Sequence, residues 1–394
     1  MSLTPPLYGA LWNYLAQWCI HKDLRHLKAL VWMVVGLIGS QKLTLTEWEP
    51  YVQSSAQYAQ SYQRRWRRFL ANPRINVSDW YLPLVMNAIK GWKDSPVSLS
   101  LDTTLLWNEY CMIHLSVVCC GRAVPLLWKT LKHGSASVAF KEYQPLLEQA
   151  HQLLSEYSEV TLLADRAFPS HDLLDWLATS QWHWCLRLAR DTQVRGPLAR
   201  ARSCELSYLT PKLGEAKLYH QVRLWEDGRH CCNLVLAHPR GFEGDDWWGV
   251  ITDLPPSLET LWLYAERFCC EELFLDSKSG AFELEHSKLR DAQALNRLYL
   301  VVAIALLFST QQGIAVQVAG LRRQVDPHWD RGLSFLKIGL RWLTGTIHKG
   351  RSLWLPAPLP SQNPEPCFAS RKAKQRSYHC LEFERVRVLS CSSN

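Results

Sequence analysis

The chain has 394 residues, 47% hydrophobic and 20% charged, so it can bury a sizeable core and has the length of about two or three domains. Its formal net charge of +8 fits a polyanionic partner. The 13 cysteines include adjacent pairs but no C-x-x-C spacing, which argues against a disulfide framework, a zinc ribbon and a thioredoxin motif.

Membrane and secretory features are not expected. The longest apolar runs, Ala29–Gly39 and Leu298–Phe308, are too short to span a bilayer and predict buried helices. The opening residues do not resemble a secretory signal. We therefore expect a cytoplasmic protein with reduced thiols and no membrane partner.

Residues 1–92 predict a helical N-terminal DNA-binding domain. Tyr8–Ile20 and Leu24–Ile38 are apolar stretches of helical length. In the later stretch Ser61–Leu70, Trp66 and Phe69 can dock inward while the basic residues point outward. A solvated basic face is the alternative, but the density of the run favours contact with phosphates by Arg64, Arg65, Arg67 and Arg68.

Residues 93–190 predict the first part of a ribonuclease-H-like α/β core. The expected order is three antiparallel strands, then helix, strand, helix and strand. These elements are Val97–Thr104, Tyr110–Val118, Ala123–Thr130, Phe140–Tyr157, Val160–Asp165, a helix starting at Ser170, and Trp182–Leu188. In that topology the first strand lies beside the fourth, which brings Asp102 and Asp165 together.

Residues 191–255 predict a β-rich insertion. Lys217–Trp225 and His230–Ala237 form the arms of a hairpin around Asp227-Gly228, and Trp247–Thr252 adds a strand.

Residues 256–345 predict the second part of the core and C-terminal helices. One helix follows Pro256, with a packing stripe at Leu258, Trp262, Ala265, Cys269 and Leu273. Tyr264, Arg267 and Glu271 fall on its opposite, polar face. Leu295–Phe308 and Leu333–Leu343 predict two further helices, and residues 346–394 predict a loosely packed, Pro-rich basic tail.

The acids Asp102, Asp165 and Glu271 predict a metal site. Taken alone, a strand-end aspartate is more often structural. Taken jointly, carboxylates from two strand ends and a helix can hold two Mg²⁺ ions, roughly 4 Å apart, for in-line attack on a phosphodiester. Mn²⁺ could substitute for Mg²⁺.

A longer pattern supports this hypothesis. Tyr264, Arg267, Glu271 and Lys278 fit the spacing Y-x2-R-x3-E-x6-K, which resembles the signature of DDE transposases of the insertion-sequence-four family. Four further blocks resemble the family's sequences around its first two aspartates, inside its β insertion and, in some members, in the N-terminal region, and the resemblance covers approximately residues 60–345. These blocks are Leu101–Thr104, Ala164–Phe168, Asp245–Thr252 and Arg67–Pro73.

The resemblance implies a cut-and-paste recombinase that acts on the terminal inverted repeats of its element and on target double-stranded DNA. It implies a homodimer in the synaptic complex, phosphate contacts by Tyr264, Arg267 and Lys278, and in several members a hairpin with an extruded base. Trp248 or Trp247 is the candidate to stack on that base, although core packing is nearly as good an interpretation. Such a protein would work on the nucleoid of a bacterial-type cell.

Two alternatives remain open at this point. A metal-dependent DNA nuclease on a similar core would cut DNA without joining ends. A catalytically inactive, transposase-derived DNA-binding protein would do neither, although all three acids are present.

Overall fold

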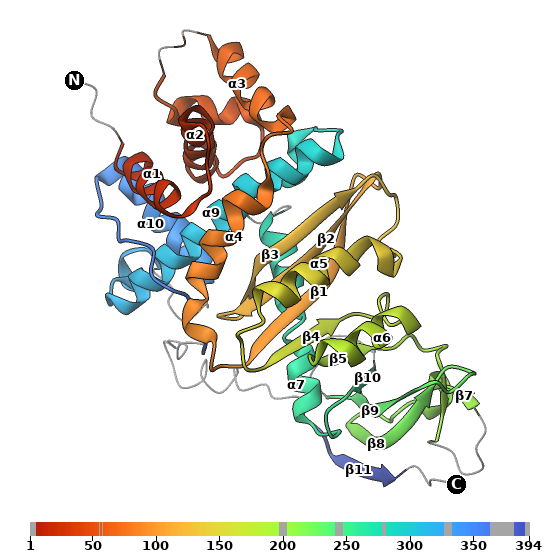
Figure 1. Ribbon diagram of the computed structural model, residues 1–394. Coiled ribbons are helices and arrows are strands. Elements are labelled where there is room, and N and C mark those ends of the chain that lie inside the picture. Colours follow the sequence, from red (N-terminus) through yellow and green to blue (C-terminus); the bar gives the residue numbers. More distant parts are fainter. Residues whose placement is uncertain are drawn as a thin grey trace. The chain divides into compact units, whose positions relative to one another are not determined.

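The computed structural model describes residues 5–54, 56, 58–196, 203–240, 247–277, 281–326, 333–362 and 382–390 (Figure 1). The chain forms two compact units. The first draws on residues within 1–93, 103–136 and 269–369, and the second on residues within 94–102, 137–268 and 370–394. Strand β1 (Val97–Leu106) contributes its first residues to the second unit and its last to the first.

The first unit is built mainly from helices. They are α1 (Pro6–Trp18), α2 (Leu24–Ser40), α3 (Ala59–Ala71), α4 (Val77–Ala88), α9 (Ala292–Val318) and α10 (Phe335–Lys349). Helix α9 contacts α2, α3, α4 and α10, so it forms the centre of this unit (Figure 1). The predicted helices at 8–20, 24–38, 295–308 and 333–343 are confirmed, but α9 extends well beyond its predicted ends.

Helix α9 is long and apolar enough to cross a membrane, but 94% of its most apolar window is buried inside the protein. Its packing on α10 also explains two glycines. A Cβ at Gly313 would lie 1.9 Å from the carbonyl oxygen of Phe335, and one at Gly339 would lie 1.7 Å from that of Ser309. The two helices therefore approach closely enough that only glycine fits at the crossing.

A β-hairpin completes the first unit. Strands β2 (Tyr110–Cys119) and β3 (Arg122–Leu131) pair antiparallel, and β3 packs on α9. The predicted pair of antiparallel strands is confirmed, and Gly121 has a φ of +69° in the tight connection between them, a conformation that favours glycine.

The second unit contains a parallel sheet region formed by β1, β4 (Val160–Ala164) and β5 (His183–Arg187). Strand β4 lies between the other two and runs parallel to both. Helices α5 (Phe140–Leu153) and α6 (His171–Ser180) provide the connections and contact each other. The predicted adjacency of the first and fourth strands is thus confirmed.

The β-rich insertion extends this same sheet. Strand β10 (Trp248–Thr252) pairs antiparallel with both β5 and β9 (His230–His238), and β9 pairs with β8 (Glu215–Leu224). The strand order in this unit is β1-β4-β5-β10-β9-β8-β6-β7, with β6 at Gln193–Arg195 and β7 at Ser203–Glu205 (Figure 1). The hairpin prediction is confirmed, and the insertion continues the core sheet.

Part of the predicted loose tail is packed. Strand β11 (Arg385–Ser390) pairs parallel with β8 in the second unit. In the first unit, the Trp92 indole donates to the carbonyl oxygen of Leu359 (2.7 Å), and Gln311 Nε2 donates to that of Ala357 (2.7 Å). The basic run 371–376 lies outside the described residues.

The helix predicted after Pro256 is interrupted. It forms α7 (Glu259–Ala265) and α8 (Phe268–Leu275), separated by a turn. The predicted faces were also wrong, because Tyr264 is fully buried whereas Trp262 is 45% exposed. Both residues belong to α7, whose buried side carries Leu261 and Tyr264, so the predicted packing stripe lay on the wrong side of that helix. Short 3-10 helices lie at Leu45–Tyr51, Lys90–Trp92, Leu206–Leu209, Leu284–Ser287 and Arg322–Gln324.

Candidate active site at the ends of two parallel strands

The two predicted catalytic aspartates follow paired residues on neighbouring parallel strands, β1 and β4. Leu101 of β1 is paired in register with Ala164 of β4. Asp102 directly follows Leu101, and Asp165 directly follows Ala164. Because the strands are parallel and paired in register, the two acids occupy neighbouring positions where β4 ends. The prediction that both acids stand at strand ends is wrong for Asp102, because β1 continues to Leu106. Asp102 is buried, and Asp165 is half-buried.

The Asp102 carboxylate is held by a buried arginine. Arg267 Nη1 donates to Asp102 Oδ2 at 2.9 Å, with both side chains at most 10% exposed. Arg267 Nε donates to the Tyr264 hydroxyl at 3.2 Å, and its guanidinium lies 4.7 Å from the centre of the Phe268 ring. Arg267 and Asp102 therefore form an ion pair that is buried away from solvent.

Burial also governs the chemistry of Tyr264. It raises the pKa of the Tyr264 phenol, while the positive charges of Arg267 and Arg187 oppose that shift. The phenol is therefore protonated at neutral pH and hydrogen-bonded to Arg267, which makes it a poor nucleophile. Its position suits a residue that orients the guanidinium.

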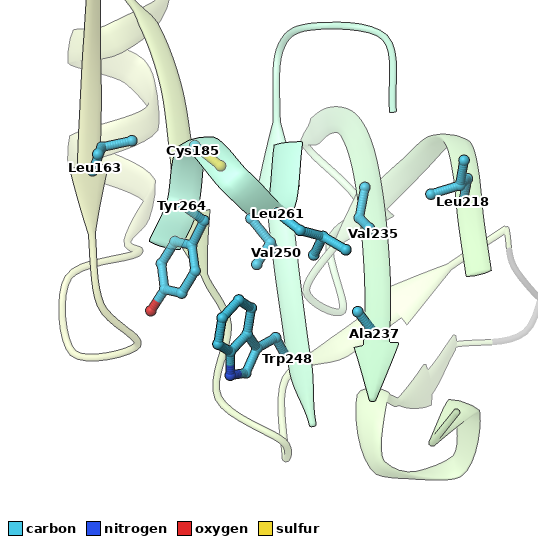
Figure 2. Close-up of a cluster of buried hydrophobic side chains, with 9 residues drawn as sticks. All are labelled: Leu163, Cys185, Leu218, Val235, Ala237, Trp248, Val250, Leu261 and Tyr264. Carbon is cyan, nitrogen blue, oxygen red and sulfur yellow. The ribbon is translucent and has the colours of Figure 1, made fainter. Parts of the chain in front are cut away.

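The tryptophans proposed for base stacking are both buried. Trp248 is 1% exposed and packs edge-on against Tyr264, with ring centres 5.5 Å apart (Figure 2). Trp247 is 6% exposed, and Arg190 lies 5.2 Å from the centre of its ring. A base could stack on either only after the surrounding side chains move, so the structure gives both a packing role in this conformation.

The third acid lies in the other unit. Glu271 is exposed on α8 within the first unit, whereas Asp102 and Asp165 belong to the second. Lys278 lies outside the described residues. Among the residues that the structure describes, no group of three or more His, Cys, Asp or Glu side chains is arranged as a metal site.

Two further charged residues, Arg187 and Glu266, lie on elements of the second unit and were not predicted from the sequence. Arg187 ends β5, the strand beside β4, and its Nη2 donates to the carbonyl oxygen of Trp247 at 3.3 Å. The strand-end rule used for Asp165 could have found Arg187. Glu266 follows α7, and burial raises the pKa of its carboxyl. No spacing pattern indicated Glu266.

The basic run of the N-terminal helices has the predicted orientation. On α3, Trp66 and Phe69 are buried in the first unit. Arg64, Arg67 and Arg68 are exposed, and Arg65 is half-buried. The helix is therefore strongly amphipathic, with its cations on the solvent side.

Comparison with known proteins decides the family. A family model described as a transposase DDE domain matches residues 108–308, just over half of the chain. The chain belongs to the DDE transposase family. Enzymes of this family cut and join DNA and generally use divalent metal ions.

The other comparisons add less. A search of curated proteins found no match. Among solved structures, the chain is similar to a piggyBac transposase in a synaptic complex with hairpin DNA, at 12% identity and a TM-score of 0.41. That likeness covers 97% of this chain and 86% of the other.

Proposed function

We propose that this transposase performs cut-and-paste transposition of an insertion sequence, with Asp102, Asp165 and Glu271 as its catalytic acids. The observation that carries the proposal is the register of two parallel strands, which gives Asp102 and Asp165 neighbouring positions directly after the paired residues Leu101 and Ala164. Family membership supplies the reaction class, since the matched segment includes Asp165 and Glu271.

The residues at these two positions suit a hard divalent cation. Asp102 and Asp165 offer carboxylate oxygens, the ligands that Mg²⁺ prefers, and Mn²⁺ accepts the same donors. Asp102, Asp165 and Glu271 would hold two ions. Ions bound there would lower the pKa of the attacking water and stabilise the leaving 3′ oxygen.

The chain's own side chains orient the substrate. Tyr264 positions the Arg267 guanidinium through their hydrogen bond. A guanidinium has a planar set of donors that suits a phosphate. For Arg267 to take up the phosphate contact that we propose, its bond to Asp102 must loosen when DNA binds. We assign a phosphate contact to Lys278 on its place in the Y-x2-R-x3-E-x6-K spacing alone.

The Y-x2-R-x3-E-x6-K spacing also indicates the subgroup of the family. We propose that the chain is a member of the insertion-sequence-four group, that it acts at terminal inverted repeats as a homodimer, and that it works on nucleoid DNA in the cytoplasm. Tyr264, Arg267 and Glu271 of the described residues carry this assignment.

Cleavage and strand transfer on repeat-ended DNA with Mg²⁺ test the proposal. Asp102→Asn, Asp165→Asn and Glu271→Gln should each lower the cleavage rate by about a thousandfold or more, because a metal ion contributes several kcal/mol to the transition state. DNA binding should be largely retained. A variant that cuts at a near wild-type rate would remove that residue from the catalytic set.

Strand transfer separates the proposal from its rivals. A nuclease would release 3′ ends and never join them to target DNA. An inactive derivative would bind the ends and leave them uncut. Joining of the cut 3′ end to a target, lost together with cleavage in the three variants, is the result that we expect.

A further inference from the structure

A basic pocket lies in the first unit between the start of α2 and one face of α3. Its volume is about 780 Å³. The lining residues are Asp23, Arg25, His26, Lys28, Ala29, Ser61, Arg64, Arg65, Arg68, Phe69 and Asn72. The α2 residues among them were not singled out by the sequence, where this helix was only an apolar stretch.

The charge of this basic pocket is strongly positive. Arginines or lysines line it at positions 25, 28, 64, 65 and 68, and Asp23 is the acid among the described lining residues. The N-terminus of α2 adds the positive end of a helix dipole. Because the exposed cations converge on one hollow, the pocket is suited to a polyanion.

Several side chains that line the basic pocket are held by contacts within the protein. Asn72 Nδ2 and His26 Nε2 are 3.0 Å apart and join the end of α3 to α2. Phe69 and Ala29 are buried beneath the charges. Arg65 also donates to Ser54 Oγ at 3.4 Å. A preformed wall loses less side-chain entropy on binding than a set of independent surface arginines would.

The shape indicates which part of DNA fits. Reading bases in the major groove requires a protruding element, such as an α-helix or a two-stranded β-ribbon. Here Arg64 and Arg68 stand one helical turn apart along the side of a hollow, which can receive a ridge of phosphates. Arg67 is exposed on the same helix but does not line the basic pocket. The four arginines of α3 are therefore not equivalent.

Asp23 opposes an anion in the basic pocket. Its carboxylate accepts bonds from Arg25 Nη2 (2.8 Å) and Nε (3.1 Å), which holds that guanidinium. It also caps α2 by accepting from the backbone N–H of Arg25 (2.8 Å). The bonds from Arg25 lower the pKa of Asp23 to about 2, so the carboxylate is charged at neutral pH.

We propose that the basic pocket binds the phosphodiester backbone of double-stranded DNA without reading its sequence, and that Asp23 weakens this binding. The inference rests on the proposed function only in taking DNA as the partner. Backbone contacts of this kind set affinity and register, while base contacts elsewhere set specificity.

Binding of the full chain to two duplexes, one with a random sequence and one with repeat ends, tests the inference. EDTA keeps cleavage out of the measurement. Asp23→Asn should tighten binding several-fold to both duplexes and make the salt dependence steeper by up to about 0.9 as Arg25 gains a phosphate. Asn caps a helix as well as Asp does, so the fold is retained.

The charge-loss variants act in the opposite direction. Arg64→Gln with Arg68→Gln should reduce the salt slope by about 1.8 on both duplexes, at about 0.9 per lost phosphate contact. Arg67→Gln is the control, with the same charge change per residue on the same helix outside the basic pocket. It should leave the slope unchanged.

Two results would overturn the inference. One is an Asp23→Asn variant that binds as the wild type does. The other is an Arg67→Gln variant that lowers the slope as much per charge as the pocket variants, which would indicate a diffuse basic face. Loss of cleavage with these binding differences intact would count against the proposed catalysis and leave the basic pocket standing.

Discussion

Arginines of the two units have opposite environments. Arg267 in the second unit is 5% exposed, with its Nη1 and Nε bonded to Asp102 and Tyr264. Arg64 and Arg68 in the first unit are exposed along the wall of the basic pocket. The same side chain therefore stabilises a buried carboxylate in one unit and is available to an external anion in the other.

The different roles of the buried and the exposed arginines follow from how well each charge is solvated. A buried charge that loses its partner is left in a medium that solvates it poorly, whereas an exposed charge returns to water at little cost. Residues of the candidate active site should thus affect stability and function together. Those of the basic pocket should affect DNA binding with little effect on stability.

The sharpest test of this comparison is Arg267→Ala against Arg67→Ala. Removing Arg267 leaves the buried Asp102 carboxylate unpaired and should lower the free energy of unfolding by about 3–5 kcal/mol. Removing the exposed Arg67 should change it by about 0.5 kcal/mol or less. Urea unfolding followed by circular dichroism measures both.

A double variant checks the cause. Asp102→Ala combined with Arg267→Ala removes both charges, so it should recover part of the stability lost in Arg267→Ala. If Arg267→Ala alone costs no more than Arg67→Ala, the ion pair is not buried as the structure has it, and the comparison fails.

A second test extends the comparison to aromatic residues. Trp248→Ala empties a packed position next to Tyr264 and should cost about 3–5 kcal/mol. Trp262→Ala is the control on a neighbouring helix, since this side chain is 45% exposed and should cost much less. Thermal unfolding of the two variants gives the comparison. Equal losses would contradict the packing role assigned to Trp248.

The smallest expected effect concerns the pairing of β11, the strand in the C-terminal tail, with β8. Glu215 of β8 accepts from the backbone N–H of Lys212 at 3.0 Å and pairs with Arg387 of β11 at 3.1 Å. The Lys212 N–H, with nearby positive charges, lowers the pKa of Glu215 below its ordinary value of 4.5. The ionised form is therefore the stabilising one, and its contribution is full above pH 4.5 and lost as the pH falls through the lowered pKa.

Glu215→Gln should accordingly lower stability by about 1 kcal/mol at pH 7. The difference from the wild type should shrink on acidification below the ordinary glutamate pKa. Urea unfolding at a series of pH values measures it. A difference that stays constant down to the acid limit would mean that the carboxylate charge is not what stabilises β11.

The sequence predicted the site's strand-borne acids because their position depends on local order. The order of strands and helices indicated a ribonuclease-H-like topology, in which the first and fourth strands are neighbours, and this paired Asp102 with Asp165. Arg187 was not predicted as a site residue, although it is a charged residue at the end of a neighbouring core strand. Tyr264 and Trp262 were assigned to the wrong faces because apolar residues occur on both sides of α7, and the side that is buried is the one that carries Leu261 and Tyr264.

The sequence by itself determined the DDE transposase resemblance, the order of the core elements and the outward arginines of α3, because these depend on spacing and hydrophobic periodicity. Only the tertiary structure decided that the insertion extends the core sheet, that β11 joins β8, and that Arg267 is buried against Asp102. Strand pairing and the burial of a charge depend on residues far apart in the chain, so the neighbours that fix them in space are invisible in any local window.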